Sequence, residues 1–262
     1  MAFDLSRIPA DFFEDPFPYY ANLLDGPPVM FQEDGSVLIS RHALLSAVYK
    51  DVNGFSSDKK LSFGPKFGVD SPLYEHHTNS LVFNDPPLHT RVRKIMTGAL
   101  NPRAIRVMEP GLRRTISILL ERMGEKNTQT GSVDIIEDFA SQIPIQIIGD
   151  LLGIPFDERD PLRDWSLAIL GALEPTVSEP QMAIGNEAVE EFKSYLRTLV
   201  EVRKKEKKDP ETDVLTRLIV AEGAEELSET ELLQNCIFIL NAGHETTTNL
   251  IGNALLMLWR HP

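Results

Sequence analysis

The stretch LNAGHETTTNL, residues 240–250, interrupts an apolar segment with a glycine, an acid and three consecutive threonines. The chain before it reads CIFIL at 236–240, and the chain after it continues through Leu255 to Trp259. Glycine in a helix costs about 1 kcal/mol relative to alanine, and threonine loses rotamer freedom against the preceding turn. A buried carboxylate such as Glu245 is costly unless it is paired or protonated. Because residues that conflict with their surroundings cluster at functional sites, this stretch is a candidate site.

A long helix is predicted to carry this stretch. It begins at Ser228, where Ser228 and Glu231 form a capping box, and continues beyond Leu256. Such a helix of about thirty residues spans roughly 45 Å at 1.5 Å per residue. Because it is apolar nearly all round, we expect it to run through the centre of the fold.

The polar residues of this helix suggest a chemical role. Thr246 lies one turn after Ala242 and can donate a hydrogen bond to its carbonyl. Gly243 removes the side chain beside that bond, so the pair permits a local bulge or kink where the helix meets a ligand. We expect Glu245 to be buried, and burial would favour its protonated form, which suits proton relay. A helix kink with a satisfied buried acid is the alternative that spacing alone leaves open.

The N-terminal part of the chain is predicted to contain the only strands. Residues 29–32 and 36–40 flank Gly35 and form a hairpin pattern, with glycine where the chain needs a positive φ. Residues 41–49 are predicted to form a short helix. Residues 54–82 show little periodicity and are predicted to be a long ordered loop.

From Leu88 onward the pattern is helical. Apolar residues recur at three-and-four spacing, which predicts helices over 102–123, 135–151 and 186–205. The fold class is therefore mainly α with a small β part. We expect one domain over residues 1–262, with a β-containing part at about 1–60 and a helical part at about 88–262.

Composition excludes several classes of partner. The net charge of −13 disfavours binding to nucleic acid and to anionic membranes. The single cysteine, Cys236, allows no intrachain disulfide, which fits a reducing cytosol. The first residues do not resemble a signal peptide, and no apolar run is long enough to span a membrane. We expect a cytoplasmic protein.

Two histidine patterns indicate no metal site. His244-Glu245 would begin the zinc motif His-Glu-x-x-His, but Thr248 stands where the second histidine belongs. His76 and His77 are adjacent, so they point apart on any regular element, and we expect them to lie in the predicted loop.

A second candidate site is the stretch DPPLHTRVR, residues 85–93. Its Asp-Pro-Pro turn leads into a helix on which His89 and Arg93 lie four residues apart on one face, with Arg91 on another. A His/Arg pair at this spacing can grip an anionic ligand group. The alternative is a solvated helix face.

DPPLHTRVR at 85–93 followed by AGHETT at 242–247 resembles the cytochrome P-450 family of haem-thiolate monooxygenases, in its soluble bacterial branch. The early stretch DPFPYYANLLDGPPVMF and GFSS at 54–57 are also similar to that branch. The resemblance covers essentially the whole chain and implies a cytochrome P-450 fold. It further implies that His89 and Arg93 hold the propionates of haem b.

The resemblance assigns the remaining site residues. Ala242 and Gly243 would lie over the haem face, and Glu245 and Thr246 would be the acid–threonine pair. Thr246 would hydrogen-bond dioxygen, and Glu245 would supply the proton route. The implied reaction inserts one oxygen atom into a small apolar organic substrate. A separate electron-transfer protein, ferredoxin-like or a flavoprotein, would deliver electrons that come from NAD(P)H.

The chain departs from the family pattern at one point. The family continues after the RHP at 260–262 into a Glu-x-x-Arg helix and a loop that carries the cysteine ligand. Cys236 lies in the central helix before the candidate kink and is expected to be a core residue. The sequence therefore resembles the N-terminal part of such an enzyme without its axial ligand, with no metal ligand of its own. A truncated, inactive helical protein with at most a binding role is the alternative.

Overall fold

The computed structural model describes residues 7–206, 208–224 and 226–261. Its residues group into two compact units. The smaller unit consists of the described residues up to Ser57 together with residues 174–176. The larger unit begins at Asp58 and holds the remaining residues. The division falls close to the predicted boundary at about residue 60. The single domain stays a prediction.

The smaller unit contains the predicted hairpin. Its elements are η2 (Ala10–Phe12), α1 (Phe17–Asp25), β1 (Val29–Phe31), β2 (Val37–Ile39) and α2 (His42–Lys50). The two strands are antiparallel, with Met30 opposite Leu38. Gly35 has a φ of 83° in the turn between them, which confirms the predicted need for glycine.

The larger unit is helical throughout its regular structure. Its elements are α3 (Lys60–Phe67), α4 (Pro72–Asn79), α5 (Leu88–Ala99), α6 (Pro102–Thr130), η3 (Ile136–Ala140), α7 (Gln142–Leu152), η4 (Phe156–Glu158), α8 (Pro161–Gly171), α9 (Glu179–Lys205), α10 (Val214–Gly223) and α11 (Glu229–Arg260). The mainly α class with a small β part is therefore confirmed. No helix among the described residues has the length and apolar character that a membrane span requires.

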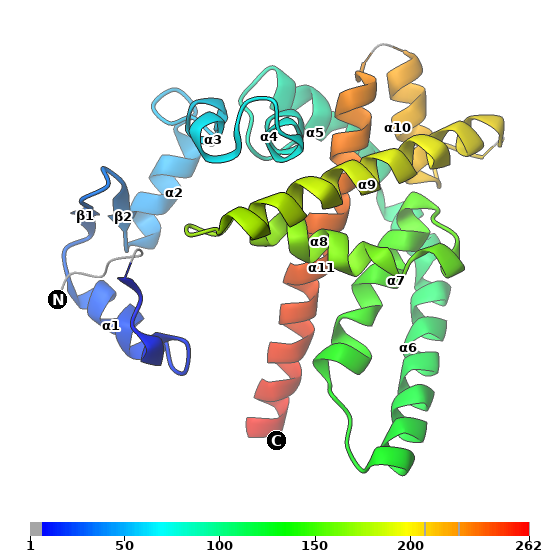
Figure 1. The fold of residues 1–262 in the computed structure, drawn as a ribbon, viewed down its shortest axis with the longest axis horizontal. Coiled ribbons are helices and arrows are strands. Elements are labelled where there is room, and N and C mark those ends of the chain that lie inside the picture. Colours follow the sequence, from blue (N-terminus) through cyan, green and yellow to red (C-terminus); the bar gives the residue numbers. More distant parts are fainter. Residues whose placement is uncertain (1–6, 207, 225, 262) are drawn as a thin grey trace. The chain divides into compact units, whose positions relative to one another are not determined.

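Helix α11 forms the centre of the larger unit, as predicted. Figure 1 shows it passing beside α7, α8 and α9, all of which it contacts. Its first half carries Cys236, Ile237 and Leu240, which are fully buried. The predicted capping box is present, because the Glu231 backbone N–H donates to Ser228 Oγ at 3.1 Å and the Ser228 N–H donates to Glu231 Oε2 at 2.8 Å.

The predicted loop over residues 54–82 is wrong. Ser71 accepts a hydrogen bond from the Tyr74 N–H and caps α4, which has Pro72 in its first turn. His76 and His77 lie in this helix, each only 2% exposed. His76 Nδ1 donates to Gln234 Oε1 of α11 at 2.9 Å. The partners of α4 are distant in sequence, so local periodicity could not reveal them.

Three other helix boundaries differ from the predictions. Helix α6 extends to Thr130, beyond the predicted end at residue 123. The helix predicted over 135–151 is split into a π-helical turn, η3, followed by α7, which Gly153 ends with a φ of 67°. Helix α9 begins before the predicted residue 186, because Ser178 and Gln181 form a capping box around Pro180.

Candidate functional site

The predicted catalytic stretch lies in the second half of α11. Ala242, Glu245 and Thr246 are exposed, and Gly243 is half-buried. The three exposed residues share one face because Glu245 and Thr246 lie three and four positions after Ala242. Thr246 Oγ1 donates to the Ala242 carbonyl at 2.8 Å, as predicted. The backbone is assigned as α-helix, without a π-helical turn, at every one of these residues, and the predicted kink stays a prediction.

The expected burial of Glu245 is wrong. This part of α11 is buried on one side only, where Asn241, His244 and Thr248 face the core. Glu245 lies beside this buried side but is itself exposed, and its side chain makes no hydrogen bond or ion pair with any described residue. The carboxylate is therefore in contact with water.

Gly243 has a packing reason of its own. A Cβ at this position would lie 3.0 Å from Ile148 Cδ1 and 3.3 Å from Ile148 Cγ1 of α7. The absence of a side chain lets α11 approach α7 closely, and Ile148 is buried at that contact. The predicted role of Gly243 over a cofactor remains a prediction beside this contact.

His89 and Arg93 lie one turn apart on α5, as predicted. The Asp85 carbonyl accepts a hydrogen bond from the His89 N–H at 3.1 Å as the helix begins. The His89 ring is half-buried and Arg93 is exposed. In the part of the chain that the structure describes, neither side chain has a hydrogen-bond or ion-pair partner, and no such bond joins them to Ala242–Thr246. Both side chains are therefore available to an anionic ligand.

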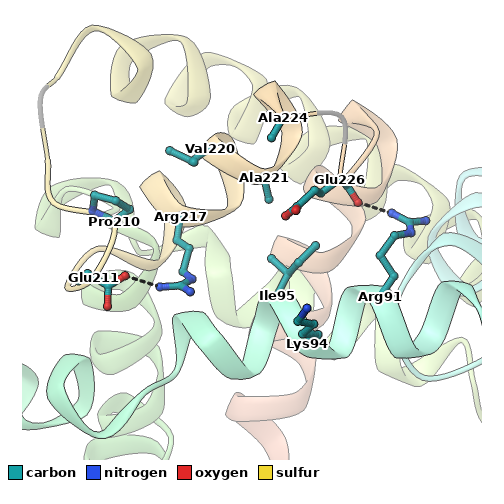
Figure 2. Close-up of a pocket in the computed structure, with 10 residues that line it drawn as sticks. All are labelled: Arg91, Lys94, Ile95, Pro210, Glu211, Arg217, Val220, Ala221, Ala224 and Glu226. Carbon is teal, nitrogen blue, oxygen red and sulfur yellow. Dashed lines mark hydrogen bonds and ion pairs between the residues drawn. The ribbon is translucent and has the colours of Figure 1, made fainter.

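Arg91, between them, has partners that sequence reasoning missed. Its guanidinium forms a two-pronged ion pair with Glu231 of α11, at 2.5 and 3.0 Å. It also lines a cavity of about 570 Å³ between α5 and α10, together with Lys94, Ile95 and Val220 (Figure 2). Glu231 was identified only as a capping residue, because nothing local signals a partner 140 positions away.

Cys236 cannot act as a thiolate. It is fully buried, and desolvation raises the pKa of its thiol to about 12. The protonated thiol is not a nucleophile at neutral pH, and its burial keeps it away from any ligand in this fold. Among the described residues, no group of three or more His, Cys, Asp or Glu side chains could hold a metal ion. The predicted core role of Cys236 is confirmed.

Buried polar groups lie directly behind the open face of α11. Asn241 Nδ2 donates to His76 Nε2 at 3.3 Å. The two ring nitrogens of His244 have no partner among the described residues. Burial, and then the charge of Arg163, lowers the pKa of His244 to about 4, so the ring is neutral at neutral pH. These side chains lie on the buried side of α11 and do not reach its open face.

Comparison with known proteins gives a consistent result. The family model described as Cytochrome P450 matches residues 28–262. The biotin biosynthesis cytochrome P450 of Bacillus subtilis is 26% identical and aligns with 98% of this chain and 63% of its own length. The vitamin D(3) 25-hydroxylase of Pseudonocardia autotrophica is 32% identical and aligns with 96% of this chain and 59% of its own length.

Solved structures share the fold. The crystal structure of CalO2 superimposes with a TM-score of 0.88 at 27% identity, covering 100% of this chain and 63% of that one. P450BioI, solved with an acyl carrier protein that carries hexadec-9Z-enoic acid, gives a TM-score of 0.84 at 25% identity, covering 97% and 64%. The chain thus spans about three fifths of the length of these relatives.

Proposed function

The chain belongs to the cytochrome P450 family, and from this we propose that it is the N-terminal part of a haem-dependent monooxygenase. The proposed reaction inserts one oxygen atom into a small apolar substrate. What supports it most is the pairing of two features: the partner-free His89 and Arg93 on α5, and the open face of α11 with Ala242 and Thr246.

Members of the family bind haem, and the residues present fit part of that group. His89 and Arg93 can supply two charge-assisted hydrogen bonds to carboxylate groups such as the propionates. Ala242 presents only a methyl group on the open face of α11, so a flat macrocycle could approach the helix closely. The thiolate does not fit, because Cys236 is buried in the core with a pKa of about 12.

In the proposed reaction, bound haem would supply the oxidising chemistry. The chain would hold the haem, shape the substrate site and deliver protons. His89 and Arg93 would hold and orient the group. The hydroxyl of Thr246 has a single hydrogen, which it donates to the Ala242 carbonyl in this structure. Its oxygen can therefore accept a hydrogen bond, and rotation of the hydroxyl would free its proton. The exposed Glu245 would carry protons from water to this position.

Two relatives support an apolar substrate. The name of one describes hydroxylation of vitamin D(3), and a structural relative was solved with hexadec-9Z-enoic acid on its carrier protein. We propose a substrate of the same apolar character for this chain, with electrons from a separate ferredoxin-like protein or flavoprotein.

The test uses a full-length form, meaning a chain that continues beyond residue 262 into the cysteine-bearing loop of the family. The protein would be expressed, supplied with haem, reduced, and examined by its carbon monoxide difference spectrum. We expect the red-shifted band of a thiolate-ligated haem, and oxygenated product when a redox partner and an apolar substrate are added. A folded full-length protein without a haem band would instead favour the non-catalytic helical protein.

A further inference from the structure

Arg91 joins the helix of His89 and Arg93 to the helix of the open face. Its Nη1 donates to Glu231 Oε2 at 3.0 Å and its Nη2 to Glu231 Oε1 at 2.5 Å. Nη1 also donates to the backbone carbonyl of Glu226, in the segment that leads into α11 (Figure 2). One guanidinium thus makes three hydrogen bonds across the start of α11. We call this set the Arg91 clamp.

Glu231 has two structural roles in the clamp. Its Oε2 accepts from both Arg91 and the Ser228 N–H, so one carboxylate caps α11 and binds α5. The Glu231 side chain is only 10% exposed. Burial alone would raise the pKa of Glu231, but the hydrogen bonds from Arg91 and Ser228 outweigh it and hold that pKa below its ordinary value. The carboxylate therefore stays charged at neutral pH, and it is shielded from water although the Arg91 side chain is 41% exposed.

The clamp acts where apolar packing of α5 is incomplete. Val92 and Met96 bury one stripe of the helix in the core. On the side of Arg91, the helix lines the cavity of about 570 Å³ that lies between α5 and α10. A helix held by a single apolar stripe can slide or rotate, because dispersion contacts lack direction. A two-pronged ion pair fixes both position and rotation.

We propose that Arg91 is a positioning residue that fixes α5 against the N-terminus of α11. It thereby orients the side chains of His89 and Arg93. Arg91 lies about 200° around the helix from each of them, at 100° per residue. It can therefore bind α11 while they face a ligand on another side. The consequence for haem rests on the function proposed above, but the effect on α5 does not.

The first test measures hydrogen exchange of the full-length form. In Arg91→Ala, the amides of α5 should exchange at least about tenfold faster, since a charged hydrogen-bonded pair is lost. Arg91→Lys should lie between, because an ammonium cannot reproduce the fork. Lys94→Ala is the matched control: Lys94 lies on the same helix, lines the same cavity and has no ion-pair partner among the described residues.

A second variant separates the clamp from the helix cap. Glu231→Gln should keep the capping box, where glutamine also serves, but lose the charge that holds Arg91. We expect α5 to exchange faster while the first turn of α11 stays protected. If α5 in Arg91→Ala exchanges like α5 in Lys94→Ala, the proposal is wrong.

The last readout is haem retention in the full-length form, at a temperature where all variants are folded by circular dichroism. Arg91→Ala should lose haem to an excess of apomyoglobin about tenfold faster, with partial rescue in Arg91→Lys. Faster exchange of α5 with unchanged haem loss would overturn the link from Arg91 to His89 and Arg93. A wild-type protein that takes up no haem would overturn the proposed function, and the exchange comparison would still decide the clamp.

Discussion

At the scale of single residues, the side of α11 on which a polar group lies decides what it can do. Thr246 and Thr248 each donate to the carbonyl four residues earlier, at 2.8 and 3.0 Å. Thr248 is buried and Thr246 is exposed. The same hydrogen bond to the backbone therefore satisfies the buried hydroxyl of Thr248 and orients the exposed hydroxyl of Thr246. Only the accessible hydroxyl can serve a bound oxidant.

Replacing Thr246 tests that distinction. In the full-length form, Thr246→Ala should retain haem while product formation falls by about 10²-fold, as for loss of a proton-transfer group. Oxygen consumption should continue, with peroxide as its product. Thr248→Ala removes the equivalent bond on the buried face and should leave the ratio of product to oxygen consumed unchanged. Equal product yields from wild type and Thr246→Ala would contradict the proposed relay.

His89 and Arg93 should act on haem binding and not on the chemical step. The double variant His89→Ala/Arg93→Ala loses two charge-assisted hydrogen bonds to propionates, at roughly 1.5–3 kcal/mol each. We expect a correspondingly weaker haem affinity by equilibrium titration, with little change in turnover of the fraction that holds haem. Unchanged affinity would instead assign both residues to a solvated helix face.

At the scale of elements, the sequence predicted what local signals specify. The capping box at Ser228 and the Asp-Pro-Pro turn before Leu88 mark the starts of α11 and α5, and both helices are present. The short helices α1, α3, α4, α8 and α10 were not predicted, and α4 packs on α9 and α11, which are distant in sequence. The burial of Glu245 was mispredicted for a related reason, since an apolar composition does not reveal which side of a helix is covered.

The contact between α7 and α11 gives a prediction about stability. Gly243→Val should lower the free energy of unfolding by about 1–3 kcal/mol, because the new side chain overpacks against Ile148. Gly124→Val is the control: a Cβ at Gly124 of α6 meets nothing within 4 Å. That change should be neutral or slightly stabilising, since valine forms helices better than glycine. Urea unfolding followed by circular dichroism measures both, and equal effects would refute the packing role of Gly243.

At the scale of the whole molecule, the last turns of α11 expose large apolar side chains. Leu250 and Leu258 are each 69% exposed, and Trp259 is 78% exposed. The same helix is fully buried around Cys236 and Leu240. Contiguous apolar surface beyond a few hundred Å² promotes association or chaperone capture. We therefore expect residues 1–262 to have low solubility as an isolated product.

The same product should not form a working haem-thiolate centre. Cys236 is the only cysteine of the chain, and it is buried within α11. Its pKa of about 12 keeps the thiol protonated. Exposing it would require unfolding the centre of the larger unit. In their proposed role, His89 and Arg93 would bind only the propionates and would not ligate iron. We would express residues 1–262, add haem, reduce the sample and record the carbon monoxide difference spectrum. We expect no band, or a band typical of nitrogen ligation. A strong red-shifted thiolate band from a soluble monomer would contradict the placement of Cys236 in the core, and Cys236→Ser would then show whether that sulfur is the ligand.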